Sequence, residues 1–307
     1  MSALTVSKEE EKRLKGQGFL NNRGTDEFSA RVITVNGKVT AAQHRCMAEA
    51  AEKFGNGNLT YTTRLSVEIQ GIPYEKIEEF QEFIAKEGLE TGGTGAKVRP
   101  VVSCKGTTCQ YGLLDSYAIS EEIFRRFYKG YRQVALPHKF KIAVGGCPNN
   151  CVKPNLNDVG IIGQRIPHFD SEACKDCKKC AIEAACPNKV AKVVDGKLHI
   201  DEELCRHCGR CVGKCPFHSI PDGTYGFKIY IGGRWGKKIS HGKALNRIFT
   251  SEEEALDVIE KAILLFKDQG LKGERFAETI ERIGFENAEK QLLEKNLLER
   301  KMEILSK

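Results

Sequence analysis

Hydrophobic residues recur with two different periods along this chain. Between residues 41 and 55, and again between 74 and 88, they return every three to four positions, which predicts two amphipathic helices. Residues 31–40 and 59–72 are rich in β-branched residues. We interpret the first as a hairpin or strand pair around Asn36-Gly37 and the second as one strand. The order strand, helix, strand, helix predicts a compact α+β unit.

The rest of the chain combines short strands with longer helices. A glycine-rich stretch at 91–97 predicts a loop, and it lacks the G-x-G-x-x-G spacing of a dinucleotide-binding turn. A helix is expected over 251–270, where Ser251 and Glu254 have the spacing of a capping box. The other expected elements are strands at 98–104, 139–147, 157–164 and 227–239, and a helix at 116–131.

The composition is that of an ordinary globular protein except for its cysteines. Of 307 residues, 40% are hydrophobic and 29% are charged, and 13 are cysteine. The first 18 residues are polar, without the apolar core of a signal peptide, and no apolar run is long enough to span a membrane. We therefore expect a protein of the reducing cytoplasm, where cysteines serve more often as metal ligands than as disulfides.

The net charge of +7 suits an anionic substrate or cofactor, although a solvated basic surface would have the same charge. Nucleic acid is not expected as a partner, because the basic residues are scattered and no nucleic-acid-binding motif accompanies them.

Eight cysteines form two repeats within residues 168–221, which look like an insertion into a surrounding domain. The second repeat, C-x2-C-x2-C-x3-C-P, matches the run of two-cluster bacterial ferredoxins, in which the fourth cysteine binds the other cluster. Zinc sites usually pair cysteines as C-x2-C twice instead of using triplets. One [4Fe–4S] cluster is thus assigned to Cys174, Cys177, Cys180 and Cys215, and the other to Cys186, Cys205, Cys208 and Cys211.

Two further cysteine pairs lie before this segment. Cys104 and Cys109 have C-x4-C spacing, and Cys147 and Cys151 have C-x3-C spacing in GGCPNNC. Both pairs follow expected strands, so four thiolates on two loops could hold a third cluster. A structural zinc site or unrelated buried thiols are the alternatives.

Several stretches around these pairs resemble the siroheme-dependent sulfite and nitrite reductases. The family's Thr-Thr-Arg strand is matched by LTYTTRLSVEIQGIP, and the strand with a second active-site arginine by VRPVVSC. The strand that supplies two lysines is matched by LPHKFKIAVGGCPNNC, and the siroheme-contacting segment by YIGGRWGKK. The match covers about residues 30–165 and 222–290. With its ferredoxin insertion, the chain is similar to the small anaerobic sulfite reductases, including their catalytic subunit.

The resemblance implies an α+β fold with a siroheme reductase core. A ferredoxin-like half-domain would occupy residues 1–90. A mixed α/β siroheme domain would occupy 91–167 and 222–307, with a two-cluster ferredoxin domain inserted at 168–221. The cofactors implied are siroheme and three [4Fe–4S] clusters. The third cluster would be held by Cys104, Cys109, Cys147 and Cys151, of which Cys151 would bridge to the siroheme iron. One copy of the core repeat implies a homo-oligomer or a subunit of a complex.

The resemblance also implies the catalytic residues. Cationic side chains would bind the oxygens of sulfite and supply protons, and the matching motifs place Arg64, Arg99, Lys139 and Lys141 in this role. Lys139 and Lys141 are two apart on a strand and so share a face, which without the motif would indicate only a solvated surface. The siroheme carboxylates would be bound by Arg234, Lys237 and Lys238, although these residues also suit a basic turn.

The chain departs from the family pattern in two places. The first pair is C-x4-C instead of C-x5-C, and His138 replaces an arginine. We expect a sulfite reductase that produces sulfide with electrons from a ferredoxin or a flavin/iron–sulfur subunit. Lys141 favours sulfite, because the ferredoxin-type nitrite reductases have asparagine at that position. Nitrite reduction to ammonia and a non-catalytic, multi-cluster electron carrier are the alternatives.

Overall fold

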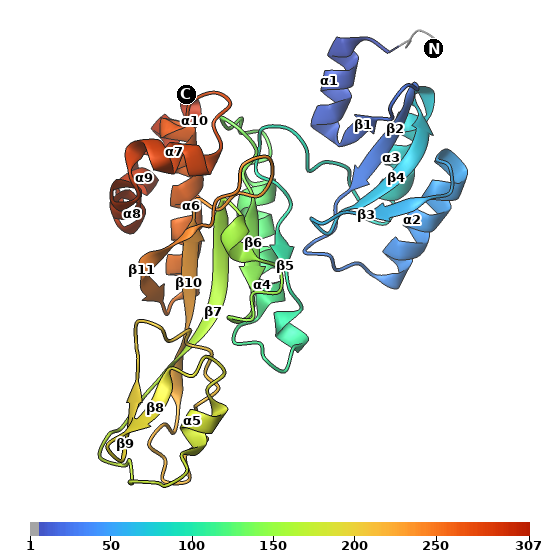
Figure 1. The fold of residues 1–307 in the computed structure, drawn as a ribbon. Coiled ribbons are helices and arrows are strands. Elements are labelled where there is room, and N and C mark those ends of the chain that lie inside the picture. The colour runs from blue at the N-terminus through green and yellow to red at the C-terminus, as the bar shows by residue number, and fades with distance from the viewer. Residues whose placement is uncertain (1–5) are drawn as a thin grey trace. The chain divides into compact units, whose positions relative to one another are not determined.

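The computed structural model describes residues 6–307 (Figure 1). These residues divide into two compact units. The first contains the chain up to Ser103 together with 120–143 and 260–307, and the second contains 104–119 and 144–259. Both mix helices and sheets, as the sequence predicts.

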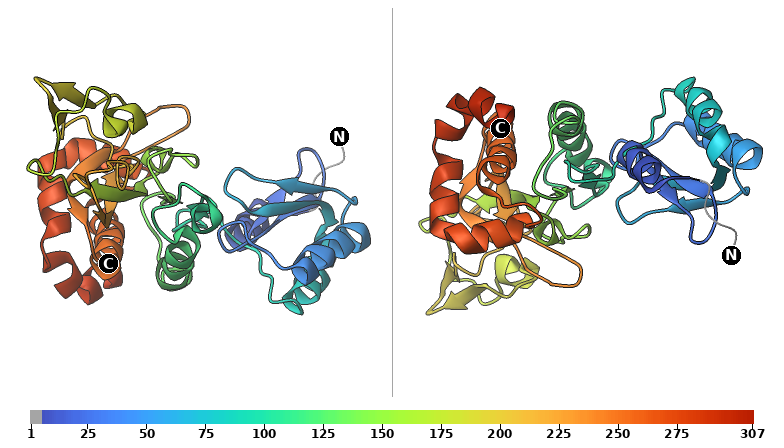
Figure 2. Two further views of the ribbon diagram at one scale, coloured as in Figure 1. Left: turned by 90° about the horizontal axis from the view of Figure 1, so that it is seen from below. Right: turned by 90° about the horizontal axis from the view of Figure 1, so that it is seen from above.

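The first unit begins with helix α1 (Lys8–Gln17) and a four-stranded antiparallel sheet in the order β1-β2-β4-β3. Helices α2 and α3 lie side by side on one face of the sheet (Figure 2). The core between the layers includes Phe19, Phe28, Met47, Phe54 and Phe80, all almost fully buried. The bounds are β1 Phe19–Asn21, β2 Glu27–Val32, α2 Ala41–Phe54, β3 Leu59–Tyr61, β4 Val67–Pro73 and α3 Ile77–Ala85.

Two sequence-based predictions in this sheet were wrong in detail. Residues 59–72 form two strands, because the chain turns at Thr62–Ser66, where Leu65 has a positive φ of 61°. Residues 31–40 do not form a full hairpin. Strand β2 ends at Val32, and only an isolated bridge between Val35 and Lys38 closes the turn at Asn36-Gly37.

The larger sheet has five strands in the order β11-β10-β7-β6-β5. Its longest ladder joins β7 and β10, which pair antiparallel over nine residues without a bulge, from Pro167 opposite Gly223 to Val159 opposite Ile231. The bounds are β5 Val102–Ser103, β6 Ile142–Gly145, β7 Val159–Pro167, β10 Gly223–Ile231 and β11 Lys243–Phe249.

Helix α4 follows strand β5, and helices α6 to α10 follow strand β11. Helix α4 (Ser116–Ile123) continues into a π-helical turn at Phe124–Lys129, where the sequence predicted one regular helix. Helix α6 (Glu252–Gln269) begins as predicted, with the Glu254 N–H donating to Ser251 Oγ at 3.4 Å. The chain ends in short helices, namely α7 Phe276–Ile283, α8 Phe285–Leu293, α9 Asn296–Glu299 and α10 Lys301–Ser306.

Along the chain, the cysteine-rich segment connects the end of β7 to the start of β10 (Figure 1). It contains helix α5 (Ala181–Ala185) and the hairpin of β8 (Ala191–Val194) and β9 (Lys197–Ile200). Its small core is formed by Ile182, Ala191, Leu198 and Ile220. Because Pro167 and Gly223 are ladder partners, the segment leaves and rejoins the sheet at one point.

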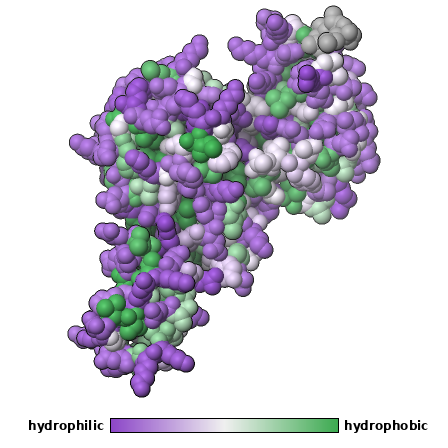
Figure 3. All heavy atoms as spheres, in the orientation of Figure 1, coloured by the Kyte–Doolittle hydropathy of each residue, from purple (hydrophilic) through white to green (hydrophobic). Residues whose placement is uncertain are grey.

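The face drawn in Figure 3 is mainly hydrophilic, with hydrophobic residues in small, separate groups. Within residues 6–307, no helix combines the length and the apolar character that crossing a bilayer requires.

Candidate functional site

The two cysteine pairs that precede the inserted segment meet at the ends of neighbouring strands. Cys104 directly follows β5, and its backbone N–H donates to the carbonyl of Val144 in β6 at 3.1 Å. The Gly146 N–H donates in turn to Cys104 Sγ at 3.1 Å. The loop that carries Cys109 is held by the Leu113 N–H, which donates to the Gly146 carbonyl at 2.8 Å.

Glycine allows these two loops to approach so closely. A Cβ placed on Gly146 would lie 2.8 Å from the Cα of Gly106 and 3.4 Å from Cys104 Sγ. A Cβ on Gly106 would lie 2.9 Å from the Cα of Gly146. Since real Cβ atoms are essentially never found that close to backbone, both positions require glycine unless the loops separate.

The GGCPNNC turn bends back through Asn150, which has a positive φ of 57°. Its N–H donates to the Cys147 carbonyl at 3.2 Å, and its side chain donates to Asn155 Oδ1 at 2.9 Å. Burial raises the pKa of the Cys147 thiol, and the nearby thiols of Cys104, Cys151 and Cys109 raise it further. The structure therefore brings together the two cysteine pairs, so that the thiols of Cys104, Cys109 and Cys151 lie near that of Cys147.

The eight cysteines of the inserted segment fall into two groups. One cavity is lined by Cys174, Cys177, Cys180 and Cys215, and another by Cys186, Cys205, Cys208 and Cys211. Burial is the main cause that raises the pKa of Cys177, and the charges of the other three thiols of its group and of Asp176 raise it further. Burial likewise raises the pKa of Cys211, and the thiol charges that add to this effect come from its own group. These are the two sets that the sequence assigned from the crossed ferredoxin pattern.

The cysteine before proline in each repeat has a distinct environment. Burial raises the pKa of Cys186, but backbone N–H groups from Asn188 to Ala191 outweigh it, and the net pKa is lowered. Burial likewise raises the pKa of Cys215, while hydrogen bonds from Ser219, Phe217 and His218 bring it below the usual value. Such N–H donors stabilise a thiolate, which is the form that binds iron.

Among the described residues, no three His, Cys, Asp or Glu side chains converge closely enough to hold a single metal ion. A cubane makes a different demand, because each thiolate binds a different iron and the sulfurs surround a volume.

Of the candidate catalytic residues, Arg64 lies in the turn between β3 and β4 and not on a strand. Its guanidinium donates to the Pro100 carbonyl at 2.6 Å and to the Ile142 carbonyl at 3.1 Å. In this conformation Arg64 fastens the turn to two other backbone segments of its unit.

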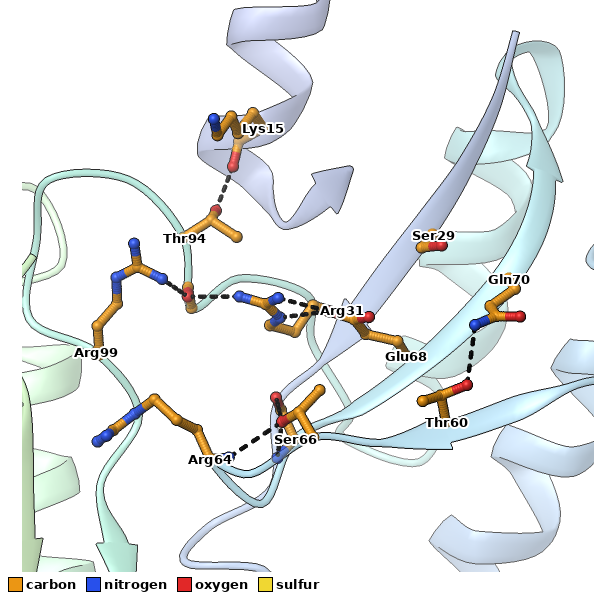
Figure 4. A network of polar contacts seen from close by, with 12 residues as sticks. Lys15, Ser29, Arg31, Thr60, Arg64, Ser66, Glu68, Gln70, Thr94 and Arg99 are labelled. Carbon is orange, nitrogen blue, oxygen red and sulfur yellow. Dashed lines mark hydrogen bonds and ion pairs between the residues drawn. The ribbon is translucent and has the colours of Figure 1, made fainter. Parts of the chain in front are cut away.

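Arg99 lies beside a second arginine that the sequence analysis missed. Arg99 and Arg31 both donate to the Gly93 carbonyl, at 2.6 and 3.2 Å (Figure 4). Arg31 also pairs with Glu68 at 2.5 Å, whereas burial and the charge of Arg31 lower the pKa of Arg99 to about 10. Arg31 belongs to no sequence motif or hydrophobic repeat. Only the fold brings it beside Arg99, so the sequence alone gives no sign of this neighbourhood.

Lys139 and Lys141 flank Phe140, which is fully buried against Phe266 and Phe276. Phe140 forms a parallel bridge with Val98, which is also buried. Because neighbouring residues of an extended chain point to opposite faces, Lys139, Lys141 and Arg99 lie on the face opposite this core.

The segment predicted to contact siroheme forms the loop between β10 and β11. Its Gly242 N–H donates to the Asn155 carbonyl at 2.8 Å, so the loop packs beside the exit of the GGCPNNC turn. Arg234 and Ser240 exchange two backbone hydrogen bonds, at 2.8 and 2.9 Å, across its base. Lys237 and Lys238 lie exposed at its tip.

Two family models match this chain. Residues 94–301 match the nitrite and sulphite reductase 4Fe-4S domain, and residues 21–87 match the nitrite/sulfite reductase ferredoxin-like half domain. The chain belongs to the nitrite and sulphite reductase family. It is therefore an oxidoreductase of the siroheme type, and the first match spans all twelve cysteines grouped above.

Relatives of this reductase include two proteins of Methanocaldococcus jannaschii. An uncharacterized protein is 32% identical over 88% of this chain and 92% of its own length. A coenzyme F420-dependent sulfite reductase is 29% identical over 77% of this chain, which matches only 37% of that longer protein. Among solved structures, dissimilatory sulfite reductase I shares the fold with a TM-score of 0.69 and 23% identity, over 87% of this chain and 69% of its own.

Proposed function

We propose that this reductase converts sulfite to sulfide at a siroheme coupled to the cluster of Cys104, Cys109, Cys147 and Cys151. The observation that carries the proposal is the grouping of these four thiols by two glycine-packed loops in a chain of this family. When bound, siroheme supplies an iron that takes the substrate, and the adjoining cluster supplies electrons one at a time.

The protein's own residues bind the anion and deliver protons. Reducing sulfite to sulfide takes six electrons and releases the oxygens as water, so cationic donors that stabilise departing oxygen lower the barrier. Lys139, Lys141 and Arg99 share one face of their unit and are the candidates. Arg99 remains protonated at neutral pH despite its lowered pKa of about 10, so it can hold an anion throughout the cycle.

Arg64 would contribute differently. Its hydrogen bonds to the Pro100 and Ile142 carbonyls fix the turn between β3 and β4, and the charge that remains accessible would favour an anionic substrate. Arg234, Lys237 and Lys238 would bind carboxylates of the macrocycle from a loop anchored beside the GGCPNNC turn.

Electrons would reach the siroheme-coupled centre through the two clusters of the inserted segment. The donor would be a ferredoxin or a flavin/iron–sulfur protein, and the chain would act as a homo-oligomer or as a subunit of a complex. The crossed grouping of the eight cysteines, with N–H donors around Cys186 and Cys215, supports two ferredoxin-type clusters here.

A visible spectrum of the anaerobically purified protein tests the proposal. Siroheme adds a Soret band and a red band to cluster absorption, and iron and sulfide counts on the same sample give the number of cubanes. A cluster-replete protein without these bands would be an electron carrier and not a reductase. Turnover of sulfite and nitrite at low, equal concentrations then identifies the preferred anion, and faster nitrite turnover would contradict the assignment to sulfite.

A further inference from the structure

The loop that carries Cys205, Cys208 and Cys211 is fastened directly to strand β7. The Arg165 N–H donates to the His207 carbonyl at 2.7 Å, and Arg165 forms a parallel bridge with Cys208. Gly209 permits this contact, since a Cβ there would lie 2.9 Å from two carbons of the Arg165 side chain. The same strand packs on the other cysteine site through Gly163, where a Cβ would lie 2.5 Å from the Gly146 carbonyl oxygen.

Both sites border one polar cavity of about 290 Å³. It is lined by Cys147 from one cysteine group and Cys208 from another, and by Arg165 and Arg210. Among the described residues that line it there are two cations and no carboxylate. The cavity of the third group, by contrast, is lined only by residues from Cys174 to Ser219.

Aromatic rings hold both guanidinium groups at this cavity. Arg165 lies over Tyr225 at 4.9 Å from the ring centroid, and Arg210 lies over Tyr111 at 4.3 Å. The second pair joins the two loops, because Tyr111 follows Cys109 by two residues and Arg210 follows Cys208 by two. The buried Nε of Arg165 has no hydrogen-bond partner within the described residues.

We propose that the Cys186, Cys205, Cys208 and Cys211 centre is the immediate electron donor to the Cys147 centre, with Arg165 and Arg210 raising the reduction potentials of both. This inference rests on the proposed function. In each step one electron leaves the donor centre, which is oxidised, and enters the Cys147 centre, which is reduced. The Cys174, Cys177, Cys180 and Cys215 centre then receives electrons from the external donor protein.

The charges of the two arginines predict the direction in which each substitution shifts the reduction potentials, and which substitution has the larger effect. Reduction adds a negative charge to a cluster, and a nearby cation stabilises it, so removing the cation lowers the potential. Arg165 is half-buried and Arg210 is exposed to screening by solvent, so losing Arg165 should have the larger effect.

The test is an EPR-monitored redox titration of the intact protein, with dithionite as reductant. Arg165→Gln and Arg210→Gln should lower the midpoint potentials of the same two centres, Arg165→Gln by more, and leave the third unchanged. Lys179→Gln is the matched control, because it removes one exposed cation beside the Cys174 group and should lower only that third centre. Arg165→Lys keeps the charge and should restore the potentials.

The proposal is overturned if the arginine variants lower the same centre as Lys179→Gln, shift one centre alone, or leave all three unchanged. It is also overturned if Arg165→Lys shifts the potentials as far as Arg165→Gln, because the effect would then be packing and not charge. Iron content and the Soret band are read on every sample. If the samples keep their iron and the Soret band but the potentials shift in the wrong pattern, only the proposed order of the centres is refuted. If the wild-type protein lacks the clusters or the Soret band, the proposed function is refuted.

Discussion

Replacing Gly146 with alanine perturbs the cysteine site without touching a thiol. The added Cβ would lie 2.8 Å from the Cα of Gly106, a backbone atom that cannot turn aside as a flexible side chain can. The loops must therefore separate by several tenths of an ångström. That movement stretches the hydrogen bond from the Gly146 N–H to Cys104 Sγ, now 3.1 Å long.

The structure also sets the size of the effect. Overpacking a tight contact costs about 1–3 kcal/mol, and weakening one hydrogen bond adds about 1 kcal/mol. A loss of roughly 2–4 kcal/mol would lower the melting temperature by roughly 3–6 °C, because the unfolding entropy of a chain of this size is about 0.6 kcal/mol/K. Because the movement separates Cys104 from the GGCPNNC turn, the iron content should fall by up to one cubane per chain.

The assay combines thermal unfolding by circular dichroism with iron and sulfide analysis of anaerobically purified protein. Gly16→Ala is the matched control, because it adds the same methyl group to α1 where no atom lies within 4 Å. If Gly146→Ala keeps both the melting temperature and the iron content of Gly16→Ala, the close approach of the loops is not needed and the reasoning fails.

Three further substitutions test other parts of the molecule. Lys141→Asn should reduce kcat/KM for sulfite more than for nitrite in steady-state assays, and equal losses would remove the argument for sulfite. Glu68→Gln leaves Arg31 without its ionic partner on the adjacent strand and should cost about 2 kcal/mol in denaturant unfolding, whereas no change would mean that the pair is merely solvated. Hydrogen bonding from Arg282 lowers the pKa of Glu274 from 4.5 to about 2, so this carboxylate stabilises the fold above pH 4.5 and the benefit is lost as the pH falls towards 2. Glu274→Gln should therefore narrow the stability difference between pH 7 and pH 3, and an unchanged pH profile would contradict the assigned cause.

The cysteine groups were predictable from sequence because ligand spacing is local information. Three thiols with two residues between neighbours fit one cubane, and the crossed fourth ligand follows from the ferredoxin run, so the two groups of four within residues 168–221 could be assigned from sequence. For Cys104, Cys109, Cys147 and Cys151, spacing alone left a zinc site or unrelated thiols open, and the family resemblance implied their grouping. Helices α2 and α6 were likewise visible as long periodic segments with polar starts.

The features that were missed depend on contacts between distant parts of the chain. Residues 59–72 form two strands because the chain turns at Leu65. The β-branched residues on both sides of this turn made the whole stretch look like one strand. Arg31 lies beside Arg99 only because β2 and the 93–99 loop fold together, so that both guanidinium groups donate to the Gly93 carbonyl. The need for glycine at 106 and 146 arises between two loops forty residues apart, where no local pattern can record it.

The pairing of Pro167 with Gly223 has a consequence for how such an enzyme can change. Ladder partners lie about 5 Å apart, so a two-residue turn could close β7 onto β10 without altering the register of either strand. The whole cysteine-rich segment can thus be gained or lost at one hairpin tip without a change in the sheet, and under the proposed function such a loss would leave the reductase dependent on outside electron donors.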